Sequence, residues 1–240
     1  MARADSYKRM LHIITPVYNE GDNFPELYRQ VSKIKTPHEL IVVYDFDEDT
    51  TVPVAKKFQK KDKKLILHKN TRGRGALGAL LSGFDYVKDG PVLVIMADLC
   101  DDLGLVDTMY GEYEKGATIV CPSRYMKGGR QLGGSLFKRF LSRMAGVSLY
   151  YVRRFPTHDA TNSFRLYDKK FIDSIQIESQ GGFSVTMEIT VKAFRRNKKI
   201  VELPTTWRDR SAGESKFKLR EWLPSYLRWY FYALAPRDRR

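Results

Sequence analysis

A short apolar segment that stops abruptly at a cluster of acids, residues 91–102, is the feature of this chain that most limits its fold. The apolar residues 91–97 are followed by Asp98, Asp101 and Asp102. Such a run, bounded by Gly-Pro and by acids, is typical of an inner strand of a parallel sheet. Ligands of open α/β sheets bind outside the carboxyl ends of these strands, so the acids are candidates for binding a cation or a sugar. The alternative is a polar turn that caps the next helix, because Asp is favoured at helix N-termini.

Apolar strands alternate with amphipathic helices along most of the chain. Strands are predicted at 9–20, a segment that ends in a loop, and at 39–44, 64–68, 91–97, 117–125 and 199–204. Helices are predicted at 23–34, 52–61, 135–147 and 183–195. The strand at 39–44 is also followed by acids, Asp45, Asp47 and Asp49. This alternation is that of βα units and predicts an α/β fold.

The composition is that of a globular protein with an unusual charge. The 240 residues are 42% hydrophobic and 29% charged, with a net charge of +14 and two cysteines. The charge indicates polyanionic partners, namely nucleic acid, an anionic lipid surface or phosphorylated substrates; a solvated basic surface is the alternative. The two cysteines favour a reducing compartment. The first ten residues lack the apolar core of a signal peptide, and no apolar run approaches the roughly 20 residues that span a bilayer, so we expect a protein that is not integral to a membrane.

A glycine-rich turn follows the third predicted strand. Gly73, Gly75 and Gly78 have the G-x-G-x-x-G spacing of dinucleotide-binding turns. That motif belongs in the first βα turn of a dinucleotide-binding fold, so we do not interpret it as such a site here. Arg72 and Arg74 in the turn favour contact with phosphate oxygens. The alternative is that the glycines only permit a tight turn.

Glu188 and the segment 219–234 each carry open alternatives. Glu188 lies in an apolar helical setting, where a carboxylate is costly unless it is paired or functional. Residues 126–130 and 206–217 are predicted to be polar loops. The aromatic and basic segment 219–234 is predicted to be either an interfacial helix at a membrane or a helix docked by its aromatic side. We therefore divide the chain into a domain at 1–217 and a C-terminal helix at 218–240.

Several motifs occur in an order and spacing that resemble one family. They are Thr15–Glu20, the Asp45/Asp47 pair, Gly75–Ala76 with Gly83–Phe84, Asp98, Ser123–Tyr125, Asp159–Arg165 and Arg210–Lys216. Together they resemble family 2 glycosyltransferases of the GT-A fold, most closely the branch of dolichol-phosphate mannosyltransferases and polyprenyl-phosphate glycosyltransferases. The resemblance covers about residues 9–217. It implies a Rossmann-like, mixed but mostly parallel central sheet flanked by helices.

The resemblance also implies roles for individual residues. Asp98 would hold Mg²⁺ or Mn²⁺ on the donor diphosphate, and Arg124 and Arg139 would hold the phosphate of a polyprenyl-phosphate acceptor. The nucleotide-sugar donor would meet two sets of residues: Pro16, Tyr18, Glu20, Asp45, Asp47, Arg74 and Gly75 at the strand ends, and Arg210, Ser215 and Lys216 in a loop that closes over the diphosphate.

One departure from the family concerns the metal. The family usually has a D-x-D motif with a further polar ligand, whereas this chain has Met96 in place of the first acid and Cys100 in place of the polar ligand. A thioether is a poor ligand for a hard cation. The resemblance therefore predicts a metal site in which Asp98 works with Asp101 or Asp102.

The implied reaction is an inverting sugar transfer. A lipid phosphate is already an anion and needs no strong base, whereas a sugar hydroxyl needs one, for which Asp159 or Glu188 would be the candidates. The basic charge and the aromatic segment 219–234 favour the lipid acceptor at the cytoplasmic face of an anionic membrane, with a membrane-anchored partner subunit as an option. The resemblance to the mannosyl branch implies GDP-mannose as the donor rather than a UDP-sugar. A non-catalytic nucleic-acid or membrane-binding module is the competing hypothesis. The basic residues are spread along the chain and RNA-stacking motifs are missing, so we expect no nucleic-acid partner.

Overall fold

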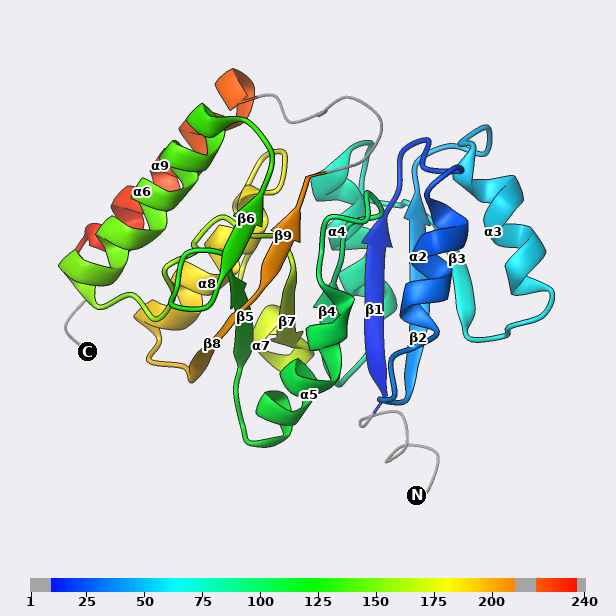
Figure 1. Ribbon diagram of the computed structural model, residues 1–240, viewed down its shortest axis with the longest axis horizontal. Helices are drawn as coiled ribbons and strands as arrows, with labels where there is room; N and C mark the ends of the chain where they lie inside the picture. The colour runs from blue at the N-terminus through cyan, green and yellow to red at the C-terminus, as the bar shows by residue number, and fades with distance from the viewer. Residues whose placement is uncertain (1–9, 210–218, 237–240) are drawn as a thin grey trace.

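The computed structural model describes residues 10–209 and 219–236, in which a seven-stranded sheet forms the centre of the molecule (Figure 1). Its strands lie in the order β3-β2-β1-β4-β7-β5-β8. Their bounds are Leu11–Pro16 for β1, His38–Tyr44 for β2, Leu65–Lys69 for β3, Pro91–Val94 for β4, Ile119–Ser123 for β5, Arg165–Asp168 for β7 and Ile200–Pro204 for β8. The predicted α/β fold with a mixed, mostly parallel sheet is confirmed.

All strands except β7 run in one direction. β1 pairs in parallel with β2 and β4, and β5 pairs in parallel with β8, while β7 is antiparallel to both β4 and β5. The carboxyl ends of β1, β2, β3, β4 and β5 and the residues before β7 therefore meet at the same edge of the sheet. This edge, which we call the carboxyl edge, receives most of the motifs that the sequence singles out.

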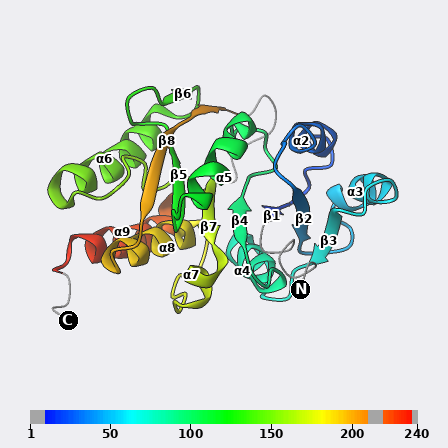
Figure 2. The same ribbon diagram turned by 90° about the horizontal axis from the view of Figure 1, so that it is seen from below.

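Helices cover both faces of the sheet, as Figure 2 shows from below. The helices α2 (Phe24–Val31), α3 (Thr51–Gln59) and α5 (Val106–Glu114) pack on one face, and α4 (Ala76–Tyr86), α7 (Lys169–Asp173) and α8 (Ser184–Arg195) pack on the other. Successive strand residues such as Ile13 and Ile14 point to opposite faces, and both are fully buried. Burial on both faces explains why the inner strands are continuously apolar.

A second, two-stranded parallel sheet was not predicted. It joins β6 (Arg130–Leu132), which begins at the last residue of the predicted loop 126–130, to β9 (Thr206–Arg208), which lies in the predicted loop 206–217. Arg130 N donates to Thr205 O at 2.9 Å, and Arg208 N donates to Cys100 O at 3.2 Å. The prediction was wrong here because strands of three residues outside the main sheet have too few positions to show an alternation of apolar and polar residues.

The helices α6 (Leu136–Arg153) and α9 (Leu219–Leu234) lie side by side at the end of the molecule away from α3 (Figure 1). α6 continues two turns beyond the predicted end at residue 147. α9 packs on α8 and α6, and it buries Trp229 and Ala233 in an apolar cluster with Leu149. Within the described residues, no helix is both long and apolar enough to cross a membrane.

Candidate active site

The carboxyl edge brings together the predicted donor-binding residues at the ends of β1 to β4. Tyr18 follows β1 and is 52% exposed, and its ring meets that of Phe46 edge-on, with 5.7 Å between centroids. Pro16 ends β1, Asp45 follows β2, and Asp98 follows β4. These residues are far apart in the sequence, so the parallel topology of the sheet is what gathers them.

The loop that carries Tyr18 is fixed by its neighbours. Asn19 adopts a left-handed φ of 55°, and its backbone N–H donates to Asp49 Oδ2 at 3.0 Å. In return, Thr50 N donates to Asn19 Oδ1 at 3.1 Å, and Glu20 N donates to Thr51 Oγ1 at 3.0 Å. The predicted donor residue Glu20 also accepts a hydrogen bond from Asn23. The Asn and the Glu of this motif thus position the loop, and Tyr18 faces outward from it.

Asp45 links the end of β2 to the glycine-rich turn. Its Oδ2 accepts from the backbone N–H of Gly75 and its Oδ1 from Asn70 Nδ2, both at 2.7 Å. A carboxylate has about four acceptor positions, so Asp45 retains capacity for a ligand. The neighbouring Asp47 forms an exposed ion pair with Lys69 instead.

The glycines of that turn are required by its backbone. Gly73 and Gly75 have φ values of 92° and 101°, and a Cβ on Gly78 would lie 1.7 Å from Gly73 O. The tight-turn interpretation therefore accounts for the glycine spacing. Arg72 pairs with Asp85 at 2.5 Å, whereas Arg74 is exposed in the turn. The hypothesis of a phosphate contact is thus carried by Arg74.

In the acid loop after β4, one acid caps a helix and two others lie at the strand end. Asp102 accepts from Gly104 N at 3.2 Å and so caps the short 3₁₀ helix Leu103–Leu105. Asp98 Oδ1 accepts from Cys100 N at 3.2 Å, and Asp101 Oδ2 accepts from Met96 N at 3.0 Å. The cap interpretation thus applies to Asp102, and ligand binding stays a prediction for Asp98 and Asp101.

Asp101 is a partly buried carboxyl group with an altered pKa. Burial, together with the negative charge of Asp98, raises the pKa of Asp101 to about 7. The effect of Asp98 means that the two carboxylates are close enough to repel one another. Because Asp102 acts as a cap, Asp101 is the better candidate to accompany Asp98 as a metal ligand.

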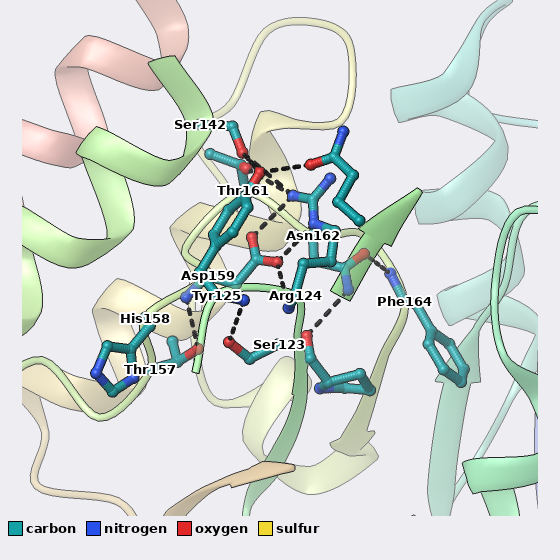
Figure 3. Close-up of polar contacts among 12 residues, drawn as sticks. Ser123, Arg124, Tyr125, Ser142, Thr157, His158, Asp159, Thr161, Asn162 and Phe164 are labelled. Atoms are coloured by element: carbon teal, nitrogen blue, oxygen red, sulfur yellow. Dashed lines mark hydrogen bonds and ion pairs between the residues drawn. The ribbon is translucent and has the colours of Figure 1, made fainter. Parts of the chain in front are cut away.

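Arg124, which follows β5, forms a buried ion pair with Asp159 from the segment before β7 (Figure 3). Arg124 Nε donates to Asp159 Oδ2 at 2.7 Å, and Arg124 Nη2 donates to Oδ1 at 2.8 Å. The Arg124 backbone N–H also donates to Oδ2 at 3.1 Å. Burial alone raises the pKa of Asp159, but the charge and hydrogen bonds of Arg124 outweigh it and lower that pKa. The pair is therefore charged on both sides.

The same arginine reaches α6. Its Nη2 lies 3.3 Å from Ser142 Oγ on α6, and Ser142 Oγ lies 2.5 Å from the hydroxyl of Tyr125. Tyr125 in turn donates to Gln131 on β6 at 3.0 Å. Arg139 is one turn before Ser142 on α6, and its charge acts on the Tyr125 hydroxyl. The structure thus brings the predicted acceptor residues Arg124 and Arg139 to one place.

The contacts of Glu188 disfavour it as a catalytic base. Its two carboxylate oxygens accept from the backbone N–H groups of Glu178 and Ser179 at 2.6 and 2.8 Å, and Lys192 Nζ donates to it at 2.7 Å. Glu188 is fully buried by these contacts and fixes the segment before α8. Asp159 is likewise a poor base, because Arg124 occupies it and lowers its pKa.

Three residues that support this site were missed by the sequence reasoning. Glu202 on β8 accepts from Thr157 Oγ1 at 3.0 Å, and from the backbone N–H and Nδ1 of His158 at 2.5 and 2.8 Å. Thr157 Oγ1 then accepts from Asp159 N at 3.0 Å. Glu202 thus holds the segment that presents Asp159 to Arg124. The only sequence signal was an acid within a predicted strand, which does not indicate its partners. The predicted donor residues Arg210, Ser215 and Lys216 lie outside the described residues.

A comparison with protein-family models shows the family to which the chain belongs. The model described as glycosyl transferase family 2 matches residues 12–176, which is more than half of the chain. The chain belongs to this family. It is a family 2 glycosyltransferase, as the motifs predicted.

Curated relatives of this glycosyltransferase include two that act on polyprenol-type lipids by name. The dolichol-phosphate mannosyltransferase of Pyrococcus furiosus is 27% identical over 212 residues, which are 86% of this chain and 58% of the relative. The polyprenol monophosphomannose synthase of Mycolicibacterium smegmatis is 27% identical over 228 residues, which are 88% of this chain and 85% of the relative. The chain thus spans less than two thirds of the length of the Pyrococcus relative.

Solved structures with the same fold include glucosyl-3-phosphoglycerate synthase from Mycobacterium tuberculosis. Its complex with Mn²⁺, uridine diphosphate and glucosyl-3-phosphoglycerate superposes with a TM-score of 0.69 at 15% identity, covering 98% of this chain and 84% of that chain. The same enzyme with Mg²⁺ and uridine diphosphate gives a TM-score of 0.66. These likenesses show the fold of the glycosyltransferase and confirm the predicted GT-A architecture.

Proposed function

We propose that this glycosyltransferase moves a sugar from a nucleotide-sugar donor to the phosphate of a polyprenyl lipid. The observation that carries the proposal is Arg124, which is held by the buried Asp159 and lies over the ring of Tyr125, at the same edge of the sheet as Asp98. The charge of Arg139 acts on the same tyrosine. Arginine donors suit phosphate oxygens, and a buried Asp partner keeps the guanidinium oriented. The names of the Pyrococcus and Mycolicibacterium relatives support the same acceptor class.

On the donor side, Tyr18 and Asp45 would bind the nucleoside, and Arg74 and Gly75 would lie near the phosphates. GDP-mannose is the favoured donor because the curated relatives are mannosyl enzymes by name. A UDP-sugar is the alternative, and the mycobacterial synthase bound to uridine diphosphate supports it. Arg210, Ser215 and Lys216 would close over the donor diphosphate.

A divalent cation, Mg²⁺ or Mn²⁺, is part of the proposal, and the donor atoms at the acid loop fit it. Asp98 and Asp101 offer carboxylate oxygens, which these ions prefer. A cation between them would also offset the repulsion that, with burial, raises the pKa of Asp101 to about 7. The described residues contain no group of three His, Cys, Asp or Glu side chains that could hold a metal, so the diphosphate and water would supply the other ligands. When bound, the ion neutralises the leaving nucleoside diphosphate.

The reaction we propose inverts the anomeric carbon. An oxygen of the acceptor phosphate forms the new bond to that carbon while the bond to the nucleoside diphosphate breaks on the opposite face. Arg124 and Arg139 would orient the acceptor phosphate, whose oxygen is already an anion and needs no base. A sugar hydroxyl acceptor in glycan synthesis is the alternative. It is disfavoured because both candidate bases are occupied, Asp159 by Arg124 and Glu188 by Lys192 and two backbone amides.

A polyprenyl phosphate resides in a membrane, so we propose that the enzyme works at the cytoplasmic face of one, peripherally or beside a membrane-anchored subunit. The competing hypothesis of a non-catalytic basic module is weakened by the family membership. The decisive experiment follows the transfer of labelled mannose from GDP-mannose, and of labelled glucose from UDP-glucose, to a polyprenyl phosphate with Mn²⁺. We expect label in the lipid fraction from one donor, and its loss in Asp98→Ala but not in Glu114→Ala, an exposed acid on α5. Label that appears only in a water-soluble saccharide would overturn the lipid acceptor.

A further inference from the structure

The helix α6 exposes a continuous apolar stripe that no contact in the described residues explains. Phe137, Phe140 and Tyr151 are 64%, 59% and 75% exposed, and Met144 is 48% exposed. Their spacing of three, four and seven residues places them on one side of the helix. The opposite side buries Gly146 and Leu149 against the domain. α6 is therefore apolar on its outward side as well as on its buried side. An exposed apolar surface of this kind marks a site of interaction with another molecule or with a membrane.

The helix α9 extends this apolar surface. It runs parallel to α6, because Ser148 Oγ lies 2.9 Å from the Tyr230 hydroxyl and Arg153 Nη2 donates to Ala235 O at 3.0 Å. Its exposed residues Leu227 and Phe231 are one turn apart, and Phe231 is 62% exposed. Figures 1 and 2 show the two helices together at one end of the molecule. We call the exposed side chains of Phe137, Phe140, Met144, Tyr151, Leu227 and Phe231 the α6–α9 face.

The charges beside this face identify its partner. The sequence of α6 contains four basic residues, Lys138, Arg139, Arg143 and Arg153, and no acid. Arg143 is exposed directly beside Phe140 and Met144. A second copy of the chain would set this basic helix against an identical one, so like charges oppose a symmetric dimer through it. An apolar face bordered by arginines matches an anionic lipid surface, in which apolar side chains enter the acyl boundary and cations meet the headgroups.

We propose that the α6–α9 face is the membrane-seating surface of the enzyme, lying flat in the headgroup region of an anionic bilayer. This inference rests on the proposed lipid acceptor and deepens it. α6 points its apolar stripe outward and its Ser142 inward, where Ser142 Oγ lies 3.3 Å from Arg124 Nη2. The helix that contacts lipid is thus also a wall of the acceptor site. A phosphate at the level of the headgroups would reach Arg124 without leaving the membrane surface.

The first test is co-sedimentation of the full chain with vesicles made of equal parts phosphatidylcholine and phosphatidylglycerol. We expect binding to these vesicles and little to pure phosphatidylcholine. Phe140→Glu and Phe231→Glu should each weaken vesicle binding by about tenfold, because each removes an aromatic ring from the acyl boundary and adds a repelled charge. Leu132→Glu, which changes an apolar residue on β6 that is 47% exposed, should not. Equal loss in all three variants would overturn the proposal.

A charge-matched pair separates a specific surface from general attraction. Arg143→Glu and Lys57→Glu change the net charge equally, but Lys57 is exposed on α3 at the other end of the molecule. We expect Arg143→Glu to weaken vesicle binding several-fold more than Lys57→Glu. Equal effects would mean that the total charge, not this face, binds the membrane. A dimer in solution that Phe140→Glu dissociates would assign the face to a second copy and also overturn the proposal.

Sugar transfer to a short-chain polyprenyl phosphate in detergent tests the acceptor independently. If the wild-type chain transfers sugar there but does not bind vesicles, the seating surface is wrong and the proposed function stands. If it binds vesicles through this face but transfers no sugar to any polyprenyl phosphate, the proposed function is wrong and the seating surface stands. If the seating surface and the proposed function are both right, Phe140→Glu should lose sugar transfer to polyprenyl phosphate in vesicles and keep sugar transfer in detergent.

Discussion

Arg124 and Asp159 meet in a bidentate ion pair, 35 positions apart in the sequence, in which the Asp159 side chain is completely buried. Removing one member of a buried pair leaves the other charge uncompensated, which costs about 3 to 5 kcal/mol. The pair joins the end of β5 to the segment before β7. It therefore links the stability of this half of the sheet to the position of the arginine that we assign to the acceptor.

Asp159→Asn should lower the melting temperature most at neutral pH. The folded-state pKa of Asp159 lies below its ordinary value of 3.8, so the ionised carboxylate stabilises the fold at pH values above 3.8. This contribution is lost as the pH falls below 3.8 through the lowered pKa. We expect the melting temperatures of wild type and Asp159→Asn to converge in acid, as measured by thermal unfolding from pH 7 to pH 3.

The matched control is Asp85→Asn, which breaks the exposed pair with Arg72. Exposed pairs contribute about 0 to 1 kcal/mol, so this variant should melt close to wild type at every pH. A constant difference between wild type and Asp159→Asn across the same pH range would show that Asp159 does not act through its charge.

Gly146→Ala should destabilise the protein by about 1 to 3 kcal/mol, because overpacking forces neighbouring atoms to move. A Cβ at this position would lie 1.9 Å from His158 O, in the segment that Glu202 supports. Gly111→Ala in α5 is the matched control, since a Cβ there meets nothing within 4 Å. That change should stabilise the helix by about 0.5 to 1 kcal/mol. Denaturant unfolding of both variants measures the two effects, and changes of the same sign would contradict this packing.

The central sheet could be predicted from the sequence because its signals are local. The residues Leu40 to Val43 are apolar in succession and are buried on both faces, and the acids that follow such strands mark the carboxyl edge. The short strands β6 and β9 could not be predicted, because their pairing depends on contacts between segments about 75 residues apart rather than on their own pattern.

The supporting contacts of the site were equally hidden. Glu188 and Glu202 are both acids in apolar surroundings, and nothing in the sequence separates their roles. Glu188 pairs with Lys192 and accepts hydrogen bonds from two backbone amides, while Glu202 fixes Thr157 and His158. α9 docks on the domain through Trp229, as one of its two alternatives predicted. Phe231 faces outward, and a membrane contact there stays a prediction. The role of each of these residues depends on its contact partners, and only the fold determines those partners.

Tyr18→Ala should weaken the binding of the nucleotide donor and leave stability almost unchanged. The side chain is 52% exposed, so its removal opens no cavity in the core. Stacking of an aromatic side chain on a base contributes about 1 to 3 kcal/mol, so we expect binding that is about 5- to 150-fold weaker. Calorimetric titration with the nucleoside diphosphate measures this directly. Tyr151→Ala, an exposed tyrosine on α6, is the control and should bind normally. A normal affinity in Tyr18→Ala would remove this residue from the donor site.

Met96→Asp should strengthen the binding of Mn²⁺, because it restores an acid two positions before Asp98. Without metal, the new carboxylate adds repulsion to a loop in which burial and Asp98 already raise the pKa of Asp101 to about 7. It also loses apolar packing, since Met96 lies against the core face that α4 covers. The metal-free variant should therefore melt below wild type. Added Mn²⁺ should raise its melting temperature more than that of wild type, because a cation that binds only the folded state stabilises it more when it binds more tightly.

Met96→Leu separates the two effects of that change. It keeps an apolar side chain of similar volume and removes the sulfur, so its melting temperature and its response to Mn²⁺ should resemble those of wild type. If Met96→Asp responds to Mn²⁺ no more than Met96→Leu does, position 96 does not face the cation. The ligands would then be confined to Asp98, Asp101 and the diphosphate. If Asp98→Ala abolishes the rise in melting temperature with Mn²⁺ both in the wild type and in Met96→Asp, binding of the cation depends on Asp98.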